Sequence, residues 1–64
     1  MSLYDVLCEI DSRKYVAVEF KDLTRLYGYS LDLILAIDWY ELFIGVDYID
    51  DSPDDDCDLV IYLE

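Results

Sequence analysis

Apolar and polar positions divide the first twenty residues into two predicted strands joined by a turn. Residues 3–10 (LYDVLCEI) are rich in apolar and β-branched side chains, which is typical of a strand. Residues 15–20 (YVAVEF) alternate between two faces with a period of two, which predicts a second strand. The polar residues 11–14 (DSRK) between them predict a β-hairpin, although the Asn-Gly or Asp-Gly pair that fixes a tight register is absent.

A short helix is predicted after this hairpin, over residues 21–28 (KDLTRLYG). Asp22 is a suitable N-cap, and Gly28 suits the left-handed conformation that ends many helices. Tyr27 and Tyr29 flank this glycine in a connection between two elements. Since tyrosine is enriched at the centres of protein interfaces, both are candidate contact residues.

The longest apolar segment covers residues 29–45 (YSLDLILAIDWYELFIG) and predicts a second helix between Ser30 as N-cap and Gly45 as stop. A helix that is apolar on most sides has to be buried, here against the sheet and against a second subunit if the chain dimerises. We therefore expect Trp39 to complete the core. Residues 32–38 alone would also suit a strand, because short apolar runs do not distinguish the two; length and flanking residues favour the helix.

A final strand is predicted at residues 59–63 (LVIYL), whose continuous apolar run is typical of a strand buried on both faces. The element order β-β-α-α-β predicts a single small α+β domain over residues 1–64, in which a short antiparallel sheet packs on the buried apolar helix. A chain this short buries only about 60% of its unfolded surface, so its stability is expected to be marginal.

Charge restricts the partners that such a domain can bind. The formal net charge is −12, yet 56% of the residues are hydrophobic, which is too many for a disordered acidic chain. All four bases lie between residues 13 and 25, and residues 26–64 contain eleven acids and no base. Because such a surface repels nucleic acid and anionic membranes, we expect no direct binding to either, and a basic DNA-binding protein as the partner.

No residue pattern supports catalysis, so we expect a protein that is not an enzyme and that uses no metal or cofactor. The chain has no histidine, which is the commonest general base and metal ligand. Cys8 lies in a predicted buried strand, and the carboxylates around Cys57 should raise the pKa of its thiol. Two cysteines allow one disulfide at most, and two free thiols in a reducing compartment are the simpler interpretation.

The location expected from the sequence is the cytoplasm, or the host cytoplasm if a phage encodes the protein. The N-terminal residues lack the basic-then-apolar pattern of a signal peptide. No uncharged apolar run approaches the roughly 20 residues that a membrane helix needs.

The most unusual segment is residues 47–58 (DYIDDSPDDDCD), which holds seven carboxylates in twelve residues. A calcium loop starting at Asp50 would need Gly and Glu where the chain has Asp55 and Ile61, so a dedicated calcium site is not expected. A solvated loop is the common interpretation of such a composition. However, like charges this close cost free energy that a mixed surface would avoid, which favours a role for the charge itself.

Mimicry of DNA is one such role. Alternate residues of an extended chain lie about 6.6–6.8 Å apart, which matches two steps of the about 3.4 Å phosphate repeat along one DNA strand. If the segment is extended, Asp54, Asp56 and Asp58 share one face. The candidate contact residues on this hypothesis are Tyr27, Tyr29, Asp38, Glu41, Asp47, Asp50, Asp51, Asp54, Asp55, Asp56 and Asp58.

One family resemblance bears on this hypothesis. The order "YDV", a charged turn, "KYVAVEF" and "DLTRLYGYSLDLI" over residues 4–34 resembles the small uracil-DNA glycosylase inhibitors of phi29-like phages. Members of that family are homodimeric acidic DNA mimics that block the DNA-binding cleft of the glycosylase with acidic and aromatic side chains of a helix. The resemblance places Tyr27 at a contact tyrosine, whereas Leu23 and Thr24 stand where the family has an aromatic residue and an acid.

Two functions remain open on the sequence. The first is a small inhibitor, phage-encoded and directed against uracil-DNA glycosylase or a host defence complex, that mimics DNA and occupies a basic cleft. The alternative is an acidic interaction module or accessory subunit that docks by an apolar surface. Added salt should weaken the first kind of binding much more than the second.

Overall fold

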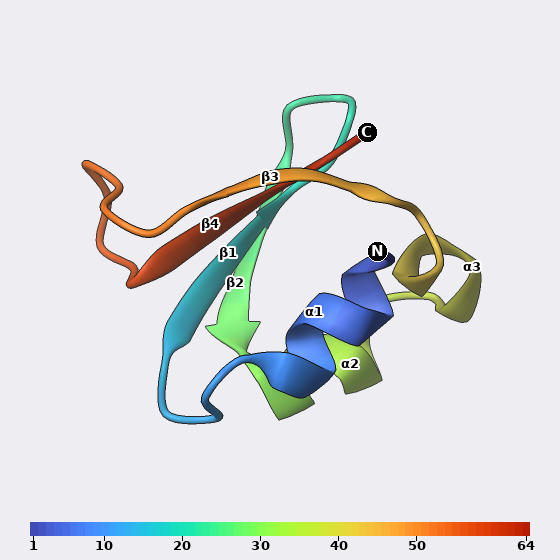
Figure 1. The fold of residues 1–64 in the computed structure, drawn as a ribbon, viewed down its shortest axis with the longest axis horizontal. Coiled ribbons are helices and arrows are strands. Elements are labelled where there is room, and N and C mark those ends of the chain that lie inside the picture. The colour runs from blue at the N-terminus through green and yellow to red at the C-terminus, as the bar shows by residue number, and fades with distance from the viewer.

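The computed structural model describes residues 1–64 as a four-stranded sheet with helices packed against one face (Figure 1). The predicted α+β class is confirmed, but the chain contains seven elements rather than five. In chain order they are α1 (Leu3–Glu9), β1 (Tyr15–Glu19), β2 (Arg25–Tyr29), α2 (Ser30–Ala36), α3 (Trp39–Leu42), β3 (Val46–Asp50) and β4 (Leu59–Leu63).

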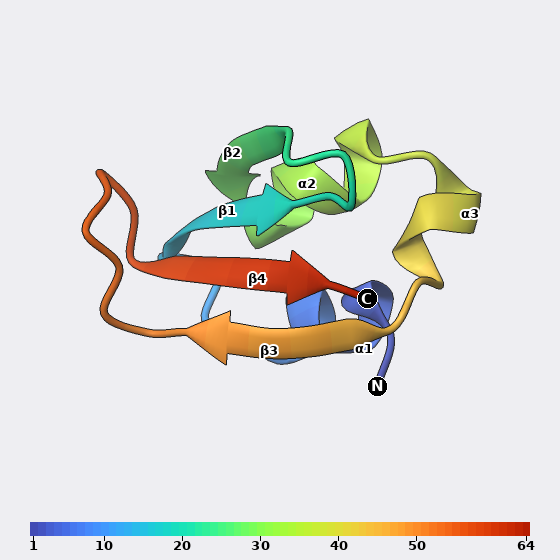
Figure 2. The same cartoon turned by 90° about the horizontal axis from the view of Figure 1, so that it is seen from above.

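The sheet is mixed, with strand order β2-β1-β4-β3. The two central strands β1 and β4 pair in parallel, and each edge strand pairs with its neighbour in antiparallel fashion. The prediction of a purely antiparallel sheet is therefore wrong. Figure 2 shows α1 behind β3 and β4, α2 behind β1 and β2, and α3 beyond the end of the sheet.

Residues 3–10 form helix α1, not the predicted strand. A capping box fixes its start: the Asp5 amide donates to Ser2 Oγ at 3.2 Å, and the Ser2 amide donates to Asp5 Oδ2 at 3.2 Å. The buried residues Leu3, Val6 and Leu7 follow a helical spacing of three and four. Consequently Cys8, which was expected in a buried strand, lies exposed on this helix, and Cys57 is likewise a free thiol.

Residues 21–28 form a turn and strand β2, not the predicted helix. Asp22 Oδ1 accepts hydrogen bonds from the Thr24 amide at 3.1 Å and from Thr24 Oγ1 at 2.6 Å, which stabilises a turn. Leu23 takes the left-handed conformation at φ 71°, whereas Gly28 has no positive φ. The hairpin of the structure therefore joins β1 to β2, one strand later than the sequence pattern predicts.

The predicted helix over residues 29–45 divides into α2 and α3, and its strand alternative is also wrong. Ile37 and Asp38 are extended, with ψ of 136° and 140°. This break lets both Ile37 and Leu42 reach one core. Ser30 is buried within α2 and is not its N-cap, and Gly45 forms a β-bridge with Ser2 rather than ending a helix.

Strand β3 was not predicted, because its sequence belongs to the acidic segment. Its register with β4 shifts between Val46 and Tyr48, which indicates a β-bulge. Only residues 51–58 of the acidic segment form a loop.

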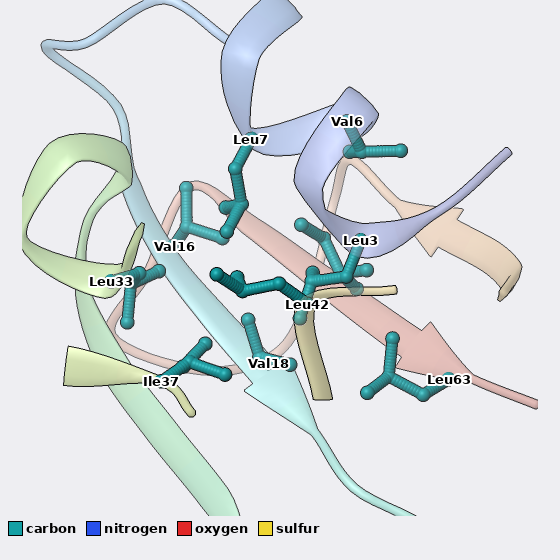
Figure 3. Close-up of a cluster of buried hydrophobic side chains, with 10 residues drawn as sticks. Leu3, Val6, Leu7, Val16, Val18, Leu33, Ile37, Leu42 and Leu63 are labelled. Carbon is teal, nitrogen blue, oxygen red and sulfur yellow. The ribbon is translucent and has the colours of Figure 1, made fainter. Parts of the chain in front are cut away.

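The core lies between the helices and the sheet. Figure 3 shows side chains from all three helices meeting those of β1 and β4. Val60 and Ile61, on opposite faces of β4, are both fully buried, which confirms a strand buried on both faces. The cluster consists of Leu3, Val6, Leu7, Val16, Val18, Leu33, Ile37, Leu42, Ile61 and Leu63. None of the helices is long and apolar enough to cross a bilayer.

Candidate protein-binding surfaces

The sheet face that turns away from the helices carries a group of tyrosines. Strand residues alternate between faces, and the cross-strand register places these tyrosines on the same side. The rings of Tyr48 and Tyr62 stack at a centroid distance of 4.5 Å, and Tyr15 meets Tyr29 edge to face at 5.4 Å. We call this group the tyrosine face; it consists of Tyr15, Tyr27, Tyr29, Tyr48 and Tyr62.

The acidic loop at residues 51–58 is tied to the tyrosine face through Asp55. The Asp55 carboxylate accepts a hydrogen bond from Tyr27 Oη at 2.6 Å and pairs with Arg25 at 2.8 Å. Arg25 also pairs with Glu19 at 3.1 Å and lies 6.0 Å from the centre of the Tyr62 ring. In Figure 1 the loop accordingly lies on the side of the sheet opposite α1 and α2.

The pKa values of these groups are shifted in the directions that the contacts require. The hydrogen bond from Tyr27, followed by those from the Asp56 amide and Arg25, lowers the pKa of Asp55. The same contact with Asp55 raises the pKa of Tyr27. Asp55 is therefore ionised at neutral pH and holds the loop with its full charge.

A second contact fixes the other end of the loop. The Asp58 amide donates to the Tyr15 carbonyl at 2.7 Å, and the Tyr15 amide donates to Asp58 Oδ2 at 2.9 Å. Because Asp58 faces β1 and residues 54–58 bend, the extended row of Asp54, Asp56 and Asp58 does not form. The acidic loop is held in one shape by these two carboxylates instead.

Four of the five remaining acids of this region are exposed, Asp50 is half-buried, and none of the five forms an ion pair. Asp47 lies on the edge strand β3, and Asp51, Asp54 and Asp56 lie on the loop. Asp50, at the end of β3, accepts a hydrogen bond from the Ser52 amide at 3.0 Å. We call the surface made by these residues the acidic edge; its members are Asp47, Asp50, Asp51, Asp54 and Asp56.

Basic residues do not neutralise the acidic edge. Arg13 pairs with Asp11 at 2.9 Å, and Arg25 is held by Glu19 and Asp55. The two lysines form no ion pair at all. The excess negative charge of the molecule is therefore presented to solvent.

Asp38 and Glu41 do not join the acidic edge as the sequence suggested. Asp38 directly precedes α3 and Glu41 lies within it, and Figure 2 shows α3 at the opposite end of β3 from the loop. Both residues line a hollow of about 620 Å³ between α3, the β1–β2 turn and the C-terminus, together with the bases Lys21 and Arg25. The structure thus separates the predicted acids into two groups.

A second exposed surface, which the sequence analysis missed, surrounds α3. Trp39 was expected in the core but is 73% exposed. Its ring lies 6.3 Å from those of both Tyr40 and Phe43, and Phe43 lies 6.4 Å from Tyr4 of α1. We call this group the aromatic patch: Tyr4, Trp39, Tyr40 and Phe43. The available signal was the excess of aromatic residues over what a 64-residue core can enclose.

Tyr27 and Tyr29, the candidate contact tyrosines, lie on a strand and make contacts within the chain. They are 41% and 47% exposed and both belong to strand β2, with Tyr29 directly before the start of α2. Tyr27 holds the acidic loop through Asp55, and Tyr29 packs on Tyr15. The helix that the resemblance to the glycosylase inhibitors implied at this position is absent.

No metal site or homologue gives a further clue to function. No three His, Cys, Asp or Glu residues are close enough to hold a metal ion. The chain matches no model of a known protein family, no curated protein and no solved structure. The functional argument therefore depends on the chemistry of the acidic edge and the aromatic patch.

Proposed function

We propose that this protein is a small non-enzymatic inhibitor whose acidic edge occupies the basic DNA-binding cleft of a partner protein in place of DNA. The observation that carries this proposal is a group of carboxylates on an edge strand and the following loop, most of them exposed and with no base among them. A basic cleft is the complementary surface, because DNA presents only phosphate charge along its backbone.

The anchoring of the loop supports this proposal. Asp55 and Asp58 bind the protein's own sheet, which fixes the position of Asp56 between them and of Asp54 directly before them. Prior ordering of a binding loop reduces the entropy lost on association. The carboxylates thus have separate tasks: some hold the loop and others face the partner.

The partial resemblance to the phi29-type inhibitors makes uracil-DNA glycosylase the first target to test. The assay measures uracil excision from DNA by the purified glycosylase while this protein is titrated, at low and at high salt. We expect inhibition that weakens as salt rises, because exposed charge pairs are screened beyond about 10 Å at 0.1 M ionic strength.

Two double variants with the same net charge show whether the position of the charge matters. Asp54→Asn with Asp56→Asn changes the acidic edge, and Glu9→Gln with Asp32→Asn changes exposed acids on the helices; each moves the net charge from −12 to −10. We expect only the first to lose inhibition. Equal loss in both would show that net charge alone is responsible. If no DNA-binding enzyme is inhibited at low salt, the proposal is wrong.

A second candidate function is an interaction module that docks by an apolar surface. The aromatic patch favours it, since monomeric proteins seldom leave several large aromatic side chains together in water. This binding would persist at salt concentrations that abolish inhibition through the acidic edge.

A further inference from the structure

The aromatic patch is exposed because core packing and hydrogen bonds fix the backbone of α3 and of the residues after it. Leu42, the last residue of α3, points into the core, and its amide donates to the Asp38 carbonyl at 3.2 Å. The carbonyl of Ile44, just after α3, accepts from the amide of Leu3 at 2.9 Å. Because these contacts fix the segment, Trp39 and Phe43 have to face solvent.

Helix α2 extends the apolar exposure on the helical side of the molecule. Leu31 and Leu35 are 65% and 86% exposed. They are four residues apart and therefore lie on one face of the helix. Leu33, between them in sequence, faces the core instead. Two neighbouring elements thus leave large apolar side chains without a partner within this chain.

The charged side chains around these residues are mostly acidic. Asp38 and Glu41 flank Trp39 and Tyr40 in sequence, and Tyr40 Oη donates to Asp38 Oδ2 at 3.3 Å. Asp5 follows Tyr4 on α1. None of the helices α1, α2 and α3 contains a lysine or an arginine. The aromatic patch therefore combines apolar side chains with neighbouring carboxylates that form no ion pair, although Lys21 lines the hollow beside Asp38 and Glu41.

The apolar rings and their acidic neighbours together indicate which kind of molecule binds the aromatic patch. A second copy of the chain would bring the same excess of carboxylates together, and like charges in apposition oppose association. An anionic lipid surface is repelled for the same reason. An amphipathic helix with an apolar face bordered by lysine or arginine matches the patch, because its apolar face buries the rings and its bases pair with the acids.

We infer that the aromatic patch is the docking site for a basic amphipathic helix of a partner protein. This inference rests on the second candidate function and names the chemistry of its partner. It is separate from the acidic loop, because Figure 2 shows α3 at the opposite end of β3 from that loop. Failure of the glycosylase assay would therefore not affect it.

Trp39 is the single tryptophan of the chain and reports directly on the patch. The probe is a synthetic amphipathic peptide of leucine and lysine, about four helical turns long, added to the intact protein at low salt. We expect a saturable blue shift of the tryptophan emission as the ring leaves water. A peptide with glutamate in place of every lysine should give no shift.

Two variants and one control test the position of the site. Phe43→Ser removes a patch ring while keeping the reporter, and should weaken binding by about tenfold or more, as loss of a central interface aromatic does. Asp38→Asn with Glu41→Gln should weaken binding and reduce its dependence on salt. Tyr48→Thr removes an exposed ring from the other side of the sheet and should bind as the wild type does. Circular dichroism confirms that each variant is folded.

Three results would overturn the inference. The first is no emission shift with the leucine–lysine peptide. The second is equal binding of the glutamate peptide, which would leave an apolar docking module without preference for a basic partner. The third is a blue shift of Trp39 with rising protein concentration alone, together with dimer formation in sedimentation, since a second copy would then be the occupant.

Discussion

The capping box at Ser2 provides a test of helix α1 that separates it from the strand that the sequence pattern predicts. In the helix, Ser2 Oγ accepts a hydrogen bond from the Asp5 amide, which otherwise has no partner in the first turn. Replacement of a capping serine by alanine costs typically about 1 kcal/mol, within a range of about 0.5–2 kcal/mol. At an exposed strand position the same substitution would usually change stability by less than about 0.5 kcal/mol.

For a domain of this size, about 1 kcal/mol corresponds to a fall of about 4–8 °C in the melting temperature. We expect the full loss of stability in Ser2→Ala, because α1 supplies Leu3, Val6 and Leu7 to the core and cannot fray without exposing them. Thermal unfolding followed by circular dichroism measures this change. Ser2→Asn retains a capping oxygen and should melt close to the wild type. If Ser2→Ala melted together with the wild type and Ser2→Asn, the helical assignment of residues 3–9 would be refuted.

Three further results are expected. Leu33→Ala should reduce the free energy of unfolding in urea by about 2–5 kcal/mol, because Leu33 is fully enclosed between α2 and the sheet; a smaller loss would contradict that packing. Contact with Tyr27 and Arg25 lowers the pKa of Asp55 from its reference value of 3.8. The ionised carboxylate therefore stabilises the fold above about pH 4, and this contribution is lost as the pH falls below that value. Acid unfolding of the wild type should show this loss, and acid unfolding of Asp55→Asn should not. Burial and the charge of Asp55 raise the pKa of the Cys57 thiol, so iodoacetamide should label the exposed Cys8 first. Faster labelling of Cys57 in Tyr27→Phe would show that the hydrogen bond between Tyr27 and Asp55 holds the loop.

The two surfaces have a common origin in the size of the domain. Only 13 of the 64 residues are buried, so much of the apolar and charged surface is available for contact. The fold separates the two: the acidic loop is anchored over the tyrosine face of the sheet, and α3 with most of the aromatic patch lies beyond the opposite end of β3. This small chain therefore has two separate exposed surfaces, one charged and one apolar.

Local sequence alone determined several features of this protein. Strands β1 and β4 follow from their alternating and continuous apolar patterns, whose periods do not depend on distant residues. The excess of carboxylates and the absence of histidine are fixed by composition. Helix α1 was also locally encoded, in the Ser2–Asp5 capping box and the spacing of Leu3, Val6 and Leu7, but the β-branched content of the segment favoured a strand.

Only the tertiary structure decided the rest. Residues 25–29 are a strand because β1 offers them an edge to pair with, and this contact outweighs the local helix signals of Asp22 and Gly28. The apolar run after them divides because one straight helix could not bring both Ile37 and Leu42 into the same core. Among the aspartates of the loop, long-range hydrogen bonds distinguish Asp55 and Asp58, which hold the loop, from their unpaired neighbours. Sequence gives every carboxylate the same charge, but the chain segments that meet in space determine which of them remain free to bind a partner.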